Sequence, residues 1–150
     1  MELHWNLPTR FINFRLKYRN MQFTLSPAER LKSKKQIDWL FREGQSFFVY
    51  PFKVLYLMEH NSGKKHAGIM IMVSKKKFKQ AVLRNRIKRR VREAFRKNKL
   101  PLNAYLEKNN KSMLLGLIYT GETILPYQET ERKLILILQR LIEQDEKTVG

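Results

Sequence analysis

Apolar residues recur along the chain in two rhythms, which together predict a mixed α+β fold. Spacings of three and four, typical of helices with one buried face, occur in residues 33–43, 79–97 and 128–144. Alternating or continuous apolar runs, typical of strands, occur in residues 47–59, 66–74 and 112–120. Pro51 interrupts the first run, which therefore predicts one or two strands. We predict a single domain with a sheet of about four strands and three helices, in the order α-β-β-β-α-β-α.

Local signals refine these boundaries. Ser26-Pro27-Ala28-Glu29 predicts a short helical turn, and Ser33 predicts the start of a helix that ends at Gly44. On that helix Ile37, Leu40 and Phe41 share one face, and Leu40 is the strongest candidate for the core. The nearly continuous apolar run from Ile69 to Val73 predicts a strand in the centre of the sheet.

The segments on either side of the basic helix also have an expected arrangement. A strand over residues 66–74, a crossover helix and a strand over 112–120 form a βαβ unit, so the two strands should be parallel. Residues 98–111 are predicted as a polar connection with a helical turn at 102–106. Phe52, Val54, Tyr56 and Met58 alternate with other residues and are expected on one sheet face.

Charge changes the picture from a generic fold to a polyanion-binding one. The 150 residues include 31 Lys and Arg against 13 Asp and Glu, a formal net charge of +18. Thirteen of the 26 residues in 74–99 are basic, and Glu93 is the only acid among them. The predicted helix has an apolar face of Ile87, Val91, Ala94 and Phe95 and a second stripe of Asn85, Arg89, Arg92 and Arg96. A solvated helix face is the alternative, but the near absence of acids and the use of Arg favour nucleic-acid binding.

The same stretch resembles a known family. Ala81-Val82, Arg84-Asn85-Arg86-Ile87-Lys88-Arg89 and Arg92-Glu93, preceded by Val73-Ser74-Lys75-Lys76, are similar to the RNR motif of the protein subunit of bacterial ribonuclease P. The resemblance extends from about Phe23 to Glu143. It implies a left-handed βαβ crossover, whereas the general rule for such units is right-handed.

The resemblance also implies the functional residues. The family's basic helix contacts the catalytic RNA, which assigns RNA binding to Lys75, Lys76, Arg84, Asn85, Arg86, Lys88, Arg89 and Arg92, while the stripe adds Arg96. The precursor tRNA 5′ leader would lie between the first helix and the sheet, against Ile37, Phe41 and Tyr56. Ile37 and the linker at Phe78 depart from the family's pattern, and Phe78 is interpreted mainly as a core residue.

Catalysis is not expected from the protein itself. The chain has no cysteine, its three histidines fit no metal-ligand spacing, and no set of converging carboxylates is evident. The resemblance implies that the RNA subunit is the catalyst and holds most of the Mg²⁺, with one protein per RNA and no organic cofactor. A cytoplasmic location without membrane association is expected, because no apolar run reaches about 18 residues.

Two alternatives for function and two for the N-terminus stay open at this point. The chain could instead be a general or ribosome-associated RNA binder, or a metal-dependent nuclease acting alone. Residues 1–20 are either a basic, aromatic arm that orders on RNA or an extension ahead of a native start at Met21. Residues 21–150 would form the RNA-binding domain.

Overall fold

A computed structural model describes residues 25–60 and 62–149, and the four strands among them form one sheet. The predicted N-terminal extension lies outside these residues. The elements in chain order are η1 (Pro27–Glu29), α2 (Lys34–Glu43), β1 (Gln45–Val49), β2 (Phe52–His60), β3 (Ala67–Val73), α3 (Ala81–Asn98), α4 (Leu100–Lys108), β4 (Lys111–Tyr119) and α5 (Tyr127–Val149).

The sheet order is β1-β2-β4-β3, with the first two pairs antiparallel and β3 parallel to β4. The parallel pair confirms the predicted βαβ unit, while its hand stays a prediction. The central position predicted for β3 is wrong, because β4 lies between β2 and β3 and β3 forms an edge. The continuous apolar run of β3 does not require a central position. The Leu31 backbone N–H donates to the Ile69 carbonyl along the outer edge of β3, and Met72 lies exposed on the open sheet face.

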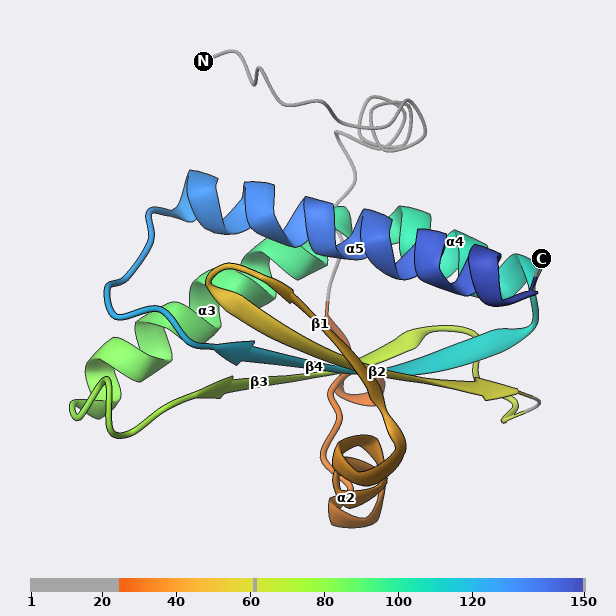
Figure 1. The fold of residues 1–150 in the computed structure, drawn as a ribbon, viewed down its shortest axis with the longest axis horizontal. Helices are drawn as coiled ribbons and strands as arrows, with labels where there is room; N and C mark the ends of the chain where they lie inside the picture. Colours follow the sequence, from red (N-terminus) through yellow and green to blue (C-terminus); the bar gives the residue numbers. More distant parts are fainter. Residues whose placement is uncertain (1–24, 61, 150) are drawn as a thin grey trace.

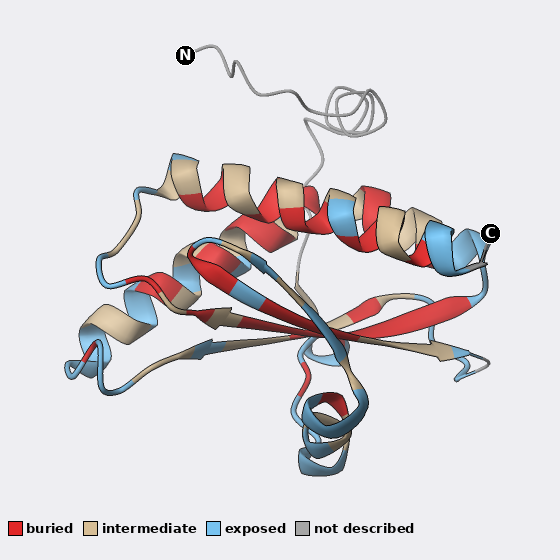
Figure 2. Cartoon of the chain, in the orientation of Figure 1, coloured by how far each residue is buried: buried red, intermediate tan, exposed pale blue. Residues whose placement is uncertain are grey.

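The two faces of the sheet are covered very differently (Figure 1). Helices α3, α4 and α5 lie over one face, and α2 alone lies over the other. The main core fills the space beneath the three helices, and the buried residues concentrate there (Figure 2). It includes the predicted apolar face of α5, whose residues are fully buried: Leu134, Ile135, Leu138, Leu141 and Ile142.

Helix α4 is a nine-residue helix where the sequence predicted a polar connection with a single helical turn, so the described residues contain four α-helices rather than three. Pro101 stands in its first turn, where a missing N–H has no cost. Leu102 and Leu106, four residues apart, are fully buried. The short apolar spacing therefore extends into a full helix because it packs against the core.

The chain enters and leaves α2 at the predicted residues. Ser26 and Glu29 form the capping box of η1, and Ser33 accepts a hydrogen bond from the backbone N–H of Gln36 at 3.4 Å. Gly44 ends the helix, and a Cβ at this position would collide with the carbonyl oxygen of Leu40. Leu40 is fully buried, as predicted for this helix face.

Candidate nucleic-acid interface

Helix α3 has the two faces that its sequence predicts. Its inner side is buried against the core, with exposed fractions of 0 to 2% for Ile87, Val91, Ala94 and Phe95. On the outer side Asn85, Arg86, Arg89 and Arg92 are exposed. Burial of one face fixes the rotation of the helix, so these polar groups are held facing outward along its length.

Three predicted RNA-binding residues on α3 are only half-exposed: Arg84, Lys88 and, near the end of the helix, Arg96. Arg84 donates hydrogen bonds from its guanidinium to the carbonyl oxygens of Phe78 and Lys79, at 2.7 and 2.9 Å. It therefore ties the loop after β3 to the first turn of α3. Lys88 is half-buried beside the apolar face, as its place on the helix predicts. These residues can support the exposed stripe as well as contact a phosphate.

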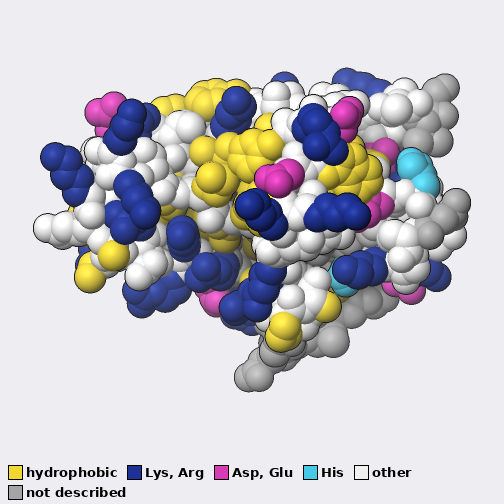
Figure 3. Space-filling view, turned by 90° about the horizontal axis from the view of Figure 1, so that it is seen from below, with side chains coloured by type: hydrophobic (Ala, Val, Ile, Leu, Met, Phe, Trp, Pro, Cys, Tyr) yellow, Lys and Arg dark blue, Asp and Glu magenta, His cyan; other side chains and the backbone are white. Residues whose placement is uncertain are grey.

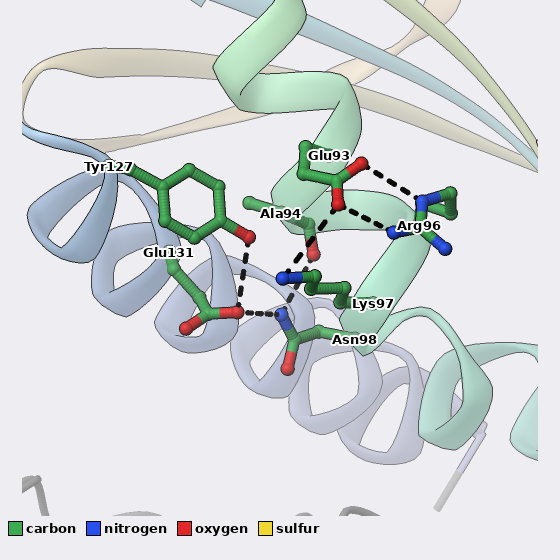
Figure 4. A network of polar contacts seen from close by, with 7 residues as sticks. All are labelled: Glu93, Ala94, Arg96, Lys97, Asn98, Tyr127 and Glu131. Atoms are coloured by element: carbon green, nitrogen blue, oxygen red, sulfur yellow. Dashed lines mark hydrogen bonds and ion pairs between the residues drawn. The ribbon is translucent and has the colours of Figure 1, made fainter. Parts of the chain in front are cut away.

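The C-terminal end of the stripe holds an internal ion-pair network (Figure 4). Arg96 binds the Glu93 carboxylate through two nitrogens at 2.9 and 2.5 Å, and the Lys97 ammonium lies 3.7 Å from the same carboxylate. The hydrogen bond from Arg96 and the neighbouring positive charges lower the pKa of Glu93 below its usual value. Glu93 is therefore ionised at neutral pH and neutralises part of the stripe around Arg96.

Below this network, two buried polar residues link α3 to α5 (Figure 4). The Asn98 amide donates to the Ala94 carbonyl at 2.8 Å and to the Glu131 carboxylate at 2.9 Å. Tyr127 donates to the same carboxylate at 3.3 Å. The sequence analysis missed this contact because its partners lie on different helices.

The loop between β3 and α3 presents Lys75 and Lys76 as exposed side chains next to the start of α3. Phe78 turns inward and is 5% exposed, with its ring centroid 6.1 Å from that of Tyr119. The interpretation of Phe78 as a core residue is confirmed. Its burial holds the basic loop against the end of the sheet.

Tyr56 does not lie where the leader was predicted to bind. It shares a face with Phe52 and Val54, as expected, but that face is covered by α3, α4 and α5. The ring is 7% exposed, and its hydroxyl donates to the Gln45 side chain at 2.7 Å. Burial, together with the charge of Asp145, raises the pKa of the Tyr56 hydroxyl. Placing Tyr56 next to α2 was therefore wrong.

The residue that faces α2 from this part of β2 is Leu55. It packs with Leu40 and Leu114 in a second, smaller cluster, with Ile37 at its border. Phe41 is 47% exposed at the edge of this region. The alternation of β2 side chains was visible in the sequence, but which face α2 covers was not, because both faces carry apolar residues.

Beyond α2 the same sheet face remains open. The strand register aligns one residue from each strand across it, and we call these four the open row: Phe48, Lys53, Ile118 and Met72. The view onto this side of the molecule shows a hydrophobic area bordered by many lysines and arginines (Figure 3). An apolar floor with a basic border suits a flexible polyanion that carries apolar rings.

Residues 25–60 and 62–149 contain neither a metal-binding cluster nor a membrane-spanning helix. No three His, Asp or Glu side chains in this part of the chain come together as a metal-binding group. Within the same residues, no helix has both the length and the hydrophobicity to cross a membrane.

Comparisons with known proteins agree with this arrangement. A sequence model of the family described as Ribonuclease P matches residues 25–141. The ribonuclease P protein component of Porphyromonas gingivalis is 34% identical over 119 residues, covering 79% of this chain and 87% of that protein. The corresponding protein of Streptococcus agalactiae is 32% identical, covering 73% and 91%.

Solved structures give the same result. The ribonuclease P protein from Thermotoga maritima aligns with a TM-score of 0.58 and 27% identity, covering 75% of this chain and 96% of that one. A fold match of nearly that whole protein therefore accompanies the sequence matches. The chain belongs to the ribonuclease P protein family.

Proposed function

We propose that this chain is the protein subunit of ribonuclease P, which assists a catalytic RNA in removing the 5′ leader from precursor tRNA. The observation that carries the proposal is the exposed part of the motif on α3: Asn85, Arg86, Arg89 and Arg92. Arginine binds phosphate through a planar pair of donors, and the buried face of α3 holds these donors in position. Lys75 and Lys76 extend the same surface.

In this proposal the protein has no catalytic residue. The RNA subunit carries the phosphodiester hydrolysis and holds most of the Mg²⁺, which supplies the charge stabilisation of that step. One protein would bind one RNA in the cytoplasm. The protein contributes affinity, because each phosphate that Lys or Arg neutralises releases condensed counterions. Each such contact also adds nearly one unit to the salt slope of binding.

We propose that the leader lies on the α2 side of the sheet, as the chain's resemblance to the family implies. The residues that contact it differ in part from those that the sequence predicted. Phe41 offers an exposed ring and the half-buried Ile37 offers an apolar edge, whereas Leu55 is buried beneath α2. Tyr56 is replaced in this role by the open row. Stacking and apolar contacts read little sequence, which suits a protein that meets many leaders.

The test is cleavage of a precursor tRNA at low Mg²⁺ by a bacterial ribonuclease P RNA, with and without this protein. We expect cleavage at the 5′ maturation site only when both are present. Cleavage by the protein alone would instead favour a nuclease, and equal binding to unrelated structured RNA at physiological salt would favour a general RNA binder.

A matched pair of variants tests the assigned surface. Arg89→Ala removes one exposed cation from α3, and Lys108→Ala removes one from the end of α4. We expect Arg89→Ala to weaken binding to the catalytic RNA by about tenfold or more and to lower the salt slope by about one. Lys108→Ala should leave both quantities nearly unchanged. Equal effects would mean that binding depends on net charge rather than on α3.

A further inference from the structure

The open row crosses the whole sheet beside α2: Phe48, Lys53 and Met72 are exposed, and Ile118 is half-buried where it packs against the small cluster beneath α2. Phe48 pairs with Lys53, Lys53 with Ile118, and Ile118 with Met72. Phe48 is 53% and Met72 40% exposed, whereas Leu55, two residues further along β2 than Lys53, is covered by α2. Four strands at a spacing of about 4.8 Å make this strip about 14 Å wide. At about 3.4 Å per stacked nucleotide, it spans about four nucleotides.

At the β1 edge the open row ends in two exposed aromatic side chains. Tyr50 follows β1 in the hairpin turn and is 57% exposed, and its ring centroid lies 6.3 Å from that of Phe48. These are the most exposed aromatic residues that the described part of the chain presents. Both lie at the edge opposite Lys75 and Lys76, which follow the other edge strand, β3.

A hollow continues from this edge towards α5. Its volume is about 510 Å³, and its lining includes Phe48, Leu136, Arg140, Glu143 and Lys147. The Arg140 guanidinium lies 4.8 Å from the centroid of the Phe47 ring, which holds the cation beside β1. Two cations against one carboxylate, in a chain of net charge +18, make the hollow suited to a polyanion.

We propose that Phe48 and Tyr50, with Arg140 and Lys147 behind them, form a second site for single-stranded RNA, which binds leader nucleotides that have already crossed the sheet. This inference rests on the proposed function, since it takes the leader as its ligand. The α2 side offers one exposed ring, Phe41, and the hairpin offers two that are more exposed, Phe48 and Tyr50. The leader enters near Lys75 at the β3 edge and leaves over β1, where bases stack on the aromatic pair and phosphates meet the two cations.

The experiment measures binding of precursor tRNAs to the holoenzyme, assembled from a bacterial ribonuclease P RNA and this protein. The substrates carry leaders from about two to about ten nucleotides, on either side of the length that the strip spans. Phe48→Leu keeps an apolar side chain and removes the ring. Tyr50→Phe keeps the ring and is the control for the second ring. Tyr50→Ser removes the second ring.

We expect Phe48→Leu and Tyr50→Ser each to weaken binding of the long-leader substrate by about tenfold, as loss of one stacked base predicts. Tyr50→Phe should bind like the unaltered protein. With the two-nucleotide leader, and with mature tRNA, all variants should be equal. An equal loss for mature tRNA would overturn the proposal, because the pair would then contact the catalytic RNA or the tRNA body.

The cations are tested by a charge-matched pair on the same helix. Arg140→Gln removes a cation of the hollow, and Lys133→Gln removes one elsewhere on α5. Only Arg140→Gln should weaken binding of the long leader. This variant also tests the site if a Phe48 variant proves unstable. Equal effects, or no effect of any variant, would overturn the proposal.

The unaltered protein separates the two proposals. If it increases affinity for long-leader substrates while the variants match it, the leader function stands and the second site is wrong. If the unaltered protein gives no leader-dependent affinity, both are wrong.

Discussion

Glu29 and Lys99 form an ion pair across 70 positions of sequence, with 2.6 Å between the ammonium and the carboxylate. Their side chains are only 12 and 8% exposed. The pair links η1, just before α2, to the junction of α3 and α4. The sequence did not indicate this pairing, because Glu29 was predicted only as part of a helix start and Lys99 is one of thirteen basic residues in 74–99.

We predict that Lys99→Met lowers the free energy of unfolding by about 3 kcal/mol, because it leaves a buried carboxylate without its cation. The double variant Glu29→Met/Lys99→Met should recover most of that loss, since it buries no charge. Urea unfolding monitored by circular dichroism measures both. Additive losses in the double variant would contradict the expected coupling.

The same pair predicts a dependence of stability on pH. Burial alone would raise the pKa of Glu29, but the hydrogen bond and charge of Lys99, with hydrogen bonds from Ser26, lower it below its ordinary value of 4.5. A carboxyl whose pKa is lower in the folded state stabilises the fold at neutral pH and loses that contribution as pH falls through the lowered pKa. The unaltered protein should therefore lose stability relative to the double variant as the pH falls below about 4.5.

Tyr56 provides a test of the proposed leader surface. Tyr56→Phe removes the hydroxyl that donates to Gln45 and keeps the buried ring. We expect it to lower the free energy of unfolding by about 1 kcal/mol and to leave leader-dependent affinity unchanged. Binding of precursor and mature tRNA to the holoenzyme measures the second quantity. A selective loss for the precursor would mean that this face does contact the leader.

At the scale of elements, α3 combines a cationic surface with one internal acid. We predict that Glu93→Gln strengthens binding to the catalytic RNA by about fivefold, equivalent to about 1 kcal/mol, because Arg96 and Lys97 lose their internal partner. The matched control is Glu107→Gln, which removes an exposed acid from α4. Filter binding at several salt concentrations would measure the affinity and its slope. Equal gains for both variants would mean that only net charge matters.

The elements differ in how far the sequence predicted them. The bounds of α2 and the buried face of α3 followed from Ser33, Gly44 and the spacing of Ile87 and Val91, which are local signals. Helix α4 was underestimated because Leu102 and Leu106 make too short a pattern without the core they pack against. The edge position of β3 was missed because strand order depends on contacts between distant residues.

At the scale of the molecule, the place of the basic motif was predictable and the sheet face that α2 covers was not. The RNR stretch carries charge and periodicity within a few turns of one helix, so its exposed side followed directly. Which sheet face α2 covers could not be predicted, because Leu55 on one face and Tyr56 on the other are both apolar enough to pack against a helix. The residues of the open row come from four strands and are aligned only by the register.

The unequal cover of the two sheet faces has a consequence for hydrogen exchange. Helix α2 buries only Leu40, whereas α3 and α5 are anchored in the main core. A helix held by so few contacts can open without global unfolding, so its amides should exchange well before those of β4. Exchange followed by NMR would measure this, and equal protection in α2 and β4 would contradict it. Early exchange of α2 would mean that the sheet is rigid beside a helix that opens locally, which under the proposed function would admit leaders of different bulk while the rest of the fold stays intact.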